Sequence, residues 1–142
     1  NSLEKARYFA DLITNETDFE LVSKPELCLL TYRYVPQSVQ IAMAKAREIG
    51  DIASLTKFNA LLDGLTKFVQ KTQREQGTSF VSRTRINPEN HLLMDIKAVV
   101  FRVVLANPLT SHEILQQVLA EQVEIANSET QYLPELLTLA QS

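Results

Sequence analysis

Residues 98–107 read AVVFRVVLAN, a strongly apolar and largely β-branched run with one arginine near its centre. Such a run, closed by the turn-forming pair Asn107-Pro108, is typical of a buried β-strand, which we expect over residues 95–106. Side chains alternate across a strand. One face of this strand carries only apolar residues: Val99, Phe101, Val103 and Leu105. The other face carries Ala98, Val100, Arg102, Val104 and Ala106.

The second face is apolar except for Arg102, whereas a solvated strand face is mostly polar. We therefore expect this face to be covered, either by the protein's own helices or by a partner domain. An arginine inside such a face needs an anion, because an unpaired buried charge is costly. An internal acid, Glu20 or Asp95, is one candidate partner for Arg102. A substrate carboxylate is the other, and residue chemistry alone leaves both open.

The rest of the chain alternates between helical and strand patterns. Apolar spacing predicts helices over 2–14 and 38–49, and a long one from a cap at Ser54 or Thr56 to a stop at Gly77. Strands are predicted over 19–22, 27–35 and 78–86, with turns at 24–26 and 87–90. Thr110 begins a capping box for a further helix, and a last helix spans 132–140. Short loops between paired strands favour an antiparallel sheet of three to four strands in an α+β fold.

Composition limits the function classes. A length of 142 residues fits one domain, and a net charge of −3 without a basic stripe argues against nucleic-acid binding. The single cysteine, Cys28, excludes an internal disulfide and a cysteine zinc cluster, and we expect it in the core. The apolar runs are too short to span a membrane and no signal segment opens the sequence, so we expect a soluble, cytoplasmic protein.

Catalytic motifs are missing from the sequence. His91 and His112 lack metal-ligand spacing, and Ser79 and Ser82 lie in a strand rather than in a nucleophile elbow. There is no P-loop and no dinucleotide-binding fingerprint. The residues therefore favour a chain without a catalytic centre of its own. A first residue of Asn rather than Met agrees with a piece of a larger protein.

Three stretches together resemble a known family. They are FELVSKPELCLLTYRYVP (19–36), GTSFVSRTRI (77–86) and FRVVLANPLTSHEIL (101–115). Their combination is similar to the C-terminal part of the group II pyridoxal phosphate-dependent amino-acid decarboxylases. The stretch 107–110, Asn-Pro-Leu-Thr, matches the branch that acts on acidic amino acids and diaminobutyrate, and we take a glutamate- or aspartate-decarboxylating enzyme as the first choice.

The resemblance implies a fold and a division of labour. Residues 1–142 would form the small domain of a fold-type-I enzyme, with helices packed mainly on one face of the sheet, docked on a large cofactor-binding domain that this chain lacks. Family members bind pyridoxal 5'-phosphate through a lysine that follows a histidine. Here Leu92 follows His91 and Glu113 follows His112, so the Schiff-base lysine is absent. The chain alone should bind no cofactor and have no activity.

The resemblance also implies a role for Arg102. In glutamate decarboxylase-like enzymes, the arginine of the Arg-x-x-x-x-Asn-Pro stretch binds the substrate carboxylate, and Arg102 occupies that position. The implied partners are the protein's own large domain, a second subunit in a homodimer and a small amino-acid substrate, with no nucleic acid and no membrane. The alternative is a stand-alone α+β binding module that uses its apolar sheet face to hold a protein partner.

The sequence also predicts the environment of other polar residues. Arg83 and Arg85 share a strand face and are expected in solvent or at an interface. Tyr32 and Tyr34 share a face and are expected in the core or in a domain interface. We expect Asn107 and Thr110 to serve as turn and cap residues rather than as ligand contacts.

Overall fold

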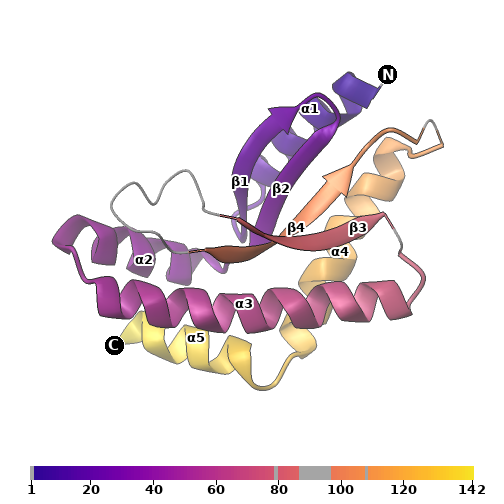
Figure 1. Ribbon diagram of the computed structural model, residues 1–142. Coiled ribbons are helices and arrows are strands. Elements are labelled where there is room, and N and C mark those ends of the chain that lie inside the picture. The colour runs from indigo at the N-terminus through magenta and orange to yellow at the C-terminus, as the bar shows by residue number, and fades with distance from the viewer. Residues whose placement is uncertain (1, 79, 87–96, 108) are drawn as a thin grey trace.

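The computed structural model of the chain describes residues 2–78, 80–86, 97–107 and 109–142. Within them the predicted α+β order of elements is confirmed (Figure 1). The elements are α1 (Ser2–Asn15), β1 (Phe19–Glu26), β2 (Leu29–Tyr34), α2 (Gln37–Ile49), α3 (Ile52–Glu75), β3 (Val81–Ile86), β4 (Ala98–Val104), α4 (His112–Ser128) and α5 (Tyr132–Gln141).

The four strands form one sheet in the order β1-β2-β4-β3, and each neighbouring pair is antiparallel. The strand that carries Arg102, β4, therefore lies inside the sheet between β2 and β3. That position agrees with its continuous apolar run, because an interior strand has no backbone edge exposed to water. The hairpin of β1 and β2 is the one expected from the sequence.

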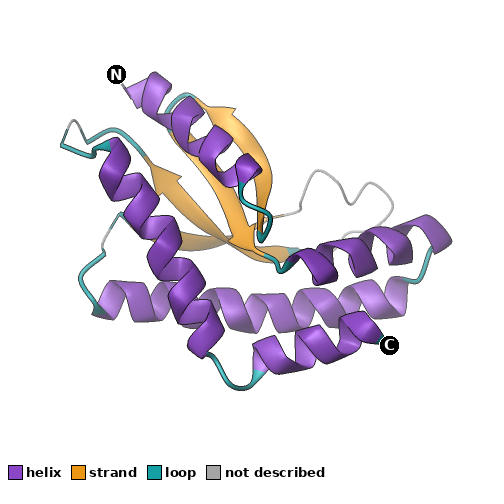
Figure 2. Ribbon diagram, turned by 180° about the vertical axis from the view of Figure 1, so that it is seen from behind, coloured by secondary structure: helices purple, strands orange, loops and turns teal. Residues whose placement is uncertain are grey.

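The helices cover one face of the sheet. Figures 1 and 2 view the molecule from opposite sides, and α1 and α4 lie behind the strands in the first view and in front of them in the second. The sheet face beneath the helices carries Val99, Phe101 and Val103, all buried as predicted. Tyr32 and Tyr34 belong to the same core. The expectation of helices mainly on one face is therefore confirmed.

A buried polar chain ties β2 to two helices. The Tyr32 hydroxyl donates to Gln122 Oε1 of α4 at 2.8 Å, and Gln122 Nε2 donates to Gln73 Oε1 of α3 at 3.0 Å. All three side chains are fully buried. Burial raises the pKa of Tyr32, and the hydrogen bond to Gln122 opposes that rise only partly, so the phenol remains a neutral donor.

Helix α5 packs closely on α3 at a glycine. A Cβ atom on Gly64 would lie 2.5 Å from ring atoms of Tyr132, well inside van der Waals contact. Any side chain at this position would force the Tyr132 ring to move, which favours glycine here although it is a poor helix former.

Three predicted boundaries are wrong. The turn placed at residues 24–26 lies instead at Leu27 and Cys28, because β1 continues through Pro25 to Glu26. The register shifts between Ser23 and Glu26, and such an irregularity lets an edge strand accommodate a proline. Cys28 is half-buried rather than a core residue. The predicted turn at 87–90 lies outside the described residues.

The other two corrections concern helix caps. Asp51, not Ser54 or Thr56, caps α3, and its carboxylate accepts from the Ser54 backbone N–H at 3.1 Å and from the Ser54 hydroxyl at 2.7 Å. Ser111, not Thr110, caps α4 by accepting from Ile114 N. Asp, Ser and Thr side chains can all cap a helix, so the residue types alone do not identify the cap. The path of the backbone into the helix decides which of the nearby candidates caps it.

Candidate functional site

The centre of β4 places Arg102 on the sheet face away from the helices. Arg102 is exposed, so no described helix of this chain covers it, and the expected cover by a partner domain stays a prediction. Val104, two residues on, is 38% exposed, whereas Ala98 and Val100 are buried in a small second cluster with Val22. This face is thus closed toward the start of β4 and open toward its end. Within the described parts of the chain, no acid lies within ion-pair distance of the Arg102 guanidinium.

Arg102 belongs to a row of four residues that crosses the whole sheet. It is paired in register with Thr31 on β2 and Ser82 on β3, and Thr31 is paired with Ser23 on β1. Residues paired in this way point to the same face, with Cβ atoms about 4.5–5.5 Å apart. We call Ser23, Thr31, Arg102 and Ser82 the Arg102 row.

Two hydrogen bonds hold the hydroxyl groups of the Arg102 row in place. The hydroxyl oxygens of Ser23 and Thr31 lie 2.6 Å apart, with either able to donate. Ser82 Oγ donates to the backbone oxygen of Arg102 at 3.3 Å. A single guanidinium thus stands among three hydroxyl groups on the open part of the face. Such a set can bind an anion, because both guanidinium and hydroxyl groups donate hydrogen bonds.

The fully buried arginine of this protein is Arg33. Its Nε donates to Glu20 Oε1 at 2.8 Å, and its Nη1 donates to Asn59 Oδ1 of α3 at 2.8 Å. Glu20, one of two acids considered for Arg102, therefore serves Arg33. The other, Asp95, lies outside the described residues. The sequence analysis missed Arg33, although its place between Tyr32 and Tyr34 in a predicted strand was a signal.

Further charges surround the Arg33 pair. Burial lowers the pKa of Arg47 on α2, and Glu20 opposes that shift. Burial raises the pKa of Asp63 on α3, although its carboxylate accepts from Val99 N at 2.8 Å and lies 3.7 Å from Arg85. Arg33 and Glu20 thus form an internal ion pair, although Nη2 of Arg33 is buried without a hydrogen-bond partner among the described residues.

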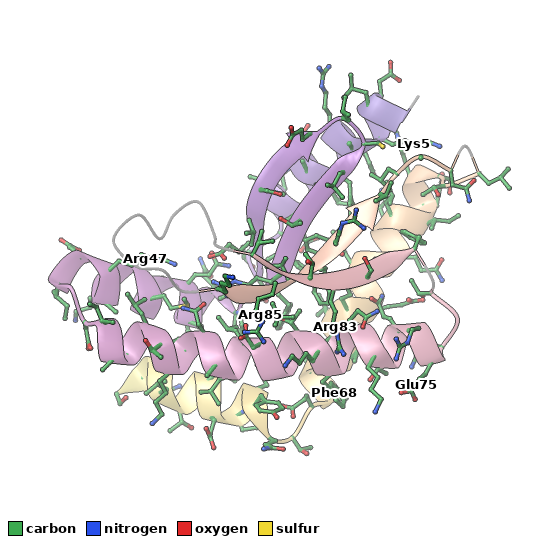
Figure 3. The ribbon with its side chains drawn as sticks, in the orientation of Figure 1. Lys5, Arg47, Phe68, Glu75, Arg83 and Arg85 are labelled. Atoms are coloured by element: carbon green, nitrogen blue, oxygen red, sulfur yellow. The ribbon has the colours of Figure 1, made fainter. Side chains whose placement is uncertain are left out.

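Arg83 and Arg85 project from β3 toward α3 (Figure 3). Both are exposed, which agrees with either of the two expectations for them, solvent or an interface. Arg83 Nη1 donates to the backbone oxygen of Lys67 on α3 at 3.3 Å. They point to the helix side of the sheet and therefore do not join Arg102.

The remaining candidates have local roles. His112 is exposed, and its ring stacks on Tyr8 of α1 with centroids 3.7 Å apart. Asn107 Oδ1 accepts from Leu109 N, which confirms it as a turn residue. The searched residues include no group of three or more His, Cys, Asp or Glu that could hold a metal ion. None of the helices that the structure describes is long and apolar enough to cross a membrane.

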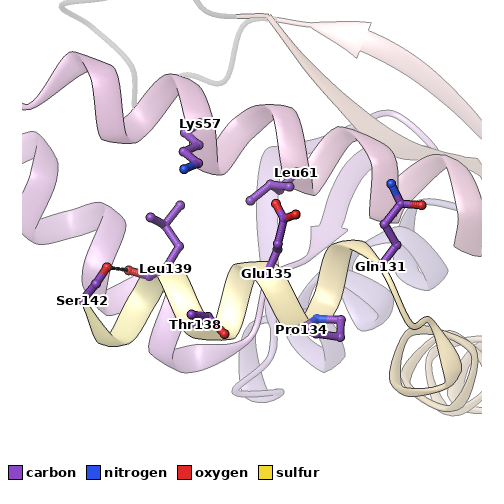
Figure 4. Close-up of a pocket in the computed structure, with 8 residues that line it drawn as sticks. All are labelled: Lys57, Leu61, Gln131, Pro134, Glu135, Thr138, Leu139 and Ser142. Carbon is purple, nitrogen blue, oxygen red and sulfur yellow. Dashed lines mark hydrogen bonds between the residues drawn. The ribbon is translucent and has the colours of Figure 1, made fainter.

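A surface hollow lies between α3 and α5 (Figure 4). Lys57 and Leu61 of α3 line it together with Pro134, Glu135 and Thr138 of α5. Figure 4 shows side chains spread along two helices rather than polar groups that converge on one point. Arg102 is not among its lining residues, so the hollow is separate from the Arg102 row.

The fold is shared with parts of solved decarboxylase structures. The glutamate decarboxylase domain of diaminobutyrate-pyruvate transaminase and L-2,4-diaminobutyrate decarboxylase from Vibrio parahaemolyticus matches 90% of this chain with 21% of its own, at 16% identity and a TM-score of 0.63. Mouse CSAD matches 88% of this chain with 22% of its own, at 20% identity and a TM-score of 0.65. Oryza sativa TDC, solved with PLP and tryptamine, matches 89% with 22%, at 15% identity and a TM-score of 0.59. The chain has the fold of the small domain of pyridoxal phosphate-dependent decarboxylases.

Sequence comparison identifies a much nearer relative. The aspartate 1-decarboxylase of Aliivibrio fischeri is 58% identical over 133 residues, which are 94% of this chain and 23% of that protein. No protein-family model matches the chain. The resemblance noted in the sequence is confirmed: the chain is a homologue of part of a group II pyridoxal phosphate-dependent decarboxylase. It spans about a quarter of the length of this relative.

The residues of this chain do not fit a pyridoxal phosphate site. The lysines whose side chains are described lie on α1, α2 and α3 or just before β4. Lys5 on α1 is half-buried. The others are exposed: Lys45, Lys57, Lys67, Lys71 and Lys97. A Schiff-base lysine instead needs a desolvated pocket that lowers its pKa. No described lysine lies in the Arg102 row, so the described residues supply no Schiff-base lysine there.

Proposed function

We propose that residues 1–142 are the C-terminal small domain of a cytoplasmic pyridoxal phosphate-dependent decarboxylase that acts on an acidic amino acid, aspartate or glutamate. The single observation that carries this proposal is the 58% identity to an aspartate 1-decarboxylase over 94% of the chain. The large domain would bind the cofactor and supply the catalytic groups, and two full-length chains would form a homodimer. This chain alone would be inactive.

Arg102 would bind the carboxylate of the substrate that leaves as carbon dioxide. Its guanidinium is exposed and has no acidic partner among the residues described, so it is available to a ligand. A guanidinium matches a carboxylate with two parallel hydrogen bonds. The carboxylate loses its charge when carbon dioxide leaves, so an ion pair that only tightened substrate binding would not accelerate the reaction. Arg102 would therefore act by holding the scissile bond in a fixed orientation.

The open part of the same face would contact the large domain. Val104 is 38% exposed beside Arg102, and Leu109, in the loop after β4, is 82% exposed. Leu27, at the β1–β2 turn, is 80% exposed and has a positive φ of 57°, which is uncommon for leucine. Exposed apolar groups of this size beside a binding arginine support an interface between domains.

Substitution of Arg102 by lysine in the full-length enzyme tests the proposal. Lysine keeps the charge and loses the two-pronged geometry, so we expect kcat/KM to fall about 100-fold with cofactor absorbance unchanged. Arg83→Lys is the matched control, because Arg83 is an exposed strand arginine on the opposite face. Near-wild-type turnover by Arg102→Lys would remove Arg102 from the site. An isolated chain that stays monodisperse and binds a protein without cofactor would favour the stand-alone module.

A further inference from the structure

We propose that the paired hydroxyls of Ser23 and Thr31 act with Arg102 as one binding site for a single carboxylate group. This assigns two further substrate-binding residues on β1 and β2. The inference rests on the function proposed above, because it takes Arg102 as the arginine that receives the substrate carboxylate.

The register of the sheet brings these groups together. Thr31 lies directly opposite Arg102, and Ser23 lies directly opposite Thr31. Thr31 is only 5% exposed, so its side chain forms the floor of the face beside the exposed arginine. An arginine side chain is longer than a threonine side chain. A guanidinium that folds toward β2 can therefore hold a carboxylate above the hydroxyl pair.

Counting hydroxyl protons shows what this pair can offer. Ser23 and Thr31 carry two hydroxyl protons, and the 2.6 Å hydrogen bond between them uses one. No described residue accepts a hydrogen bond from the second hydroxyl proton. The pair therefore retains one free donor. Ser82 differs, because its proton is donated to the backbone oxygen of Arg102. Ser82 is thus a positioning residue for β4, whereas Ser23 and Thr31 are binding residues.

The charge balance selects an anion as the ligand. Glu20 is held by Arg33, and Asp63 is held by Val99 N and lies near Arg85. These acids are therefore engaged elsewhere, and no acid among the described residues neutralises the charge of Arg102. A carboxylate offers about four lone-pair positions on its two oxygens. It can accept two hydrogen bonds from the guanidinium and a third from the hydroxyl pair.

The test uses the full-length enzyme and a substrate-like dicarboxylate that cannot react. Succinate binding to the holoenzyme is measured by titration calorimetry, with KM and kcat for the amino-acid substrate in parallel. The variant is the double substitution Ser23→Ala with Thr31→Val, since either hydroxyl alone could still donate. A hydrogen bond to a charged group is lost, so we expect the succinate Kd and the substrate KM to rise about tenfold. Thr31→Ser, which keeps a hydroxyl, should restore binding.

Thr84→Val is the matched control. Thr84 lies on β3 and faces the same side of the sheet, but it is paired with Val100 rather than with Arg102. Its loss should leave succinate binding unchanged, and an equal loss of affinity would overturn the proposal. If the double variant fails to fold, Ser23→Ala in combination with Thr31→Ala removes the same two hydroxyls and should give the same rise in the succinate Kd.

The outcomes separate this inference from the function proposed above. If Arg102→Lys weakens succinate binding and the Ser23, Thr31 double variant does not, the hydroxyl pair is not part of the site and only this inference fails. If neither change affects binding or turnover, the proposed role of Arg102 fails as well. If both weaken binding and Thr31→Ser restores it, the three residues form one carboxylate site.

Discussion

Substitution of Arg33 and of Arg102 by leucine, each in turn, tests whether Arg33 stabilises the fold and Arg102 does not. Arg33 is fully buried and makes charge-assisted hydrogen bonds to Glu20 and Asn59, each 2.8 Å long. Arg102 is exposed and has no ion pair with the described acids. We expect Arg33→Leu to destabilise the chain strongly and Arg102→Leu to leave its stability nearly unchanged.

The magnitude follows from the groups that lose their partner. Asn59 is 2% exposed, and its Oδ1 would remain buried without a donor, at about 1–3 kcal/mol. The Glu20 side chain is 18% exposed and can turn toward water, so its share stays at about 1 kcal/mol or less. We therefore expect Arg33→Leu to lower the free energy of unfolding by about 1–4 kcal/mol. Arg102→Leu should change it by no more than about 0.5 kcal/mol.

Urea denaturation followed by far-UV circular dichroism measures the difference. With a urea m-value of about 2 kcal/mol/M, the midpoint should fall by about 0.5–2 M for Arg33→Leu at unchanged m. Substitution of Asn59 by leucine in the same background should recover part of the loss, because the unpaired acceptor is removed. Equal midpoints for Arg33→Leu and Arg102→Leu would refute the assignment of the structural role to Arg33.

Three further changes test the packing and the caps. Gly64→Ala should destabilise the chain despite a helix-propensity gain of about 1 kcal/mol, because the new Cβ meets the Tyr132 ring; in a Tyr132→Ala background the same change should raise the melting temperature. Tyr32→Phe should cost about 1–2 kcal/mol in urea denaturation, since buried Gln122 loses its donor, and an unchanged midpoint would contradict the buried network. Hydrogen bonds hold the pKa of Asp51 below its ordinary value, so its cap contributes stability above the unfolded-state pKa and loses it as pH falls through the folded value. Melting temperatures from about pH 5 to about pH 2 should show this loss in the wild type and a smaller loss in Asp51→Asn.

The sequence predicted the strands and helices well because their patterns are local. Alternation in β4 placed Phe101 and Val103 in the core, and helical spacing identified α3. Boundaries were less predictable where neighbouring residues have the same capability. Thr110 and Ser111 can both cap a helix. Pro25 predicted a turn, but the edge strand β1 continues through it with an irregular register.

The candidate site was predicted only in part. The sequence singled out Arg102, and the resemblance to decarboxylases suggested what it binds. It did not indicate that Glu20 pairs with Arg33, because that contact depends on which strands become neighbours. Nor did it indicate the hydroxyls beside Arg102, since Ser23, Thr31 and Ser82 come from three other strands.

The sequence by itself determined the α+β class, the core face of β4 and the resemblance to part of a decarboxylase, because these depend on local periodicity and on residue identity. Only the tertiary structure decided which arginine is buried. Both arginines lie in apolar strands and point to the same face of the sheet, but Arg33 meets Glu20 and Asn59 where the sheet approaches α3, whereas Arg102 lies on the open part of that face. The physical reason is that a buried charge needs partners at hydrogen-bond distance, and only the folded arrangement of strands and helices supplies them.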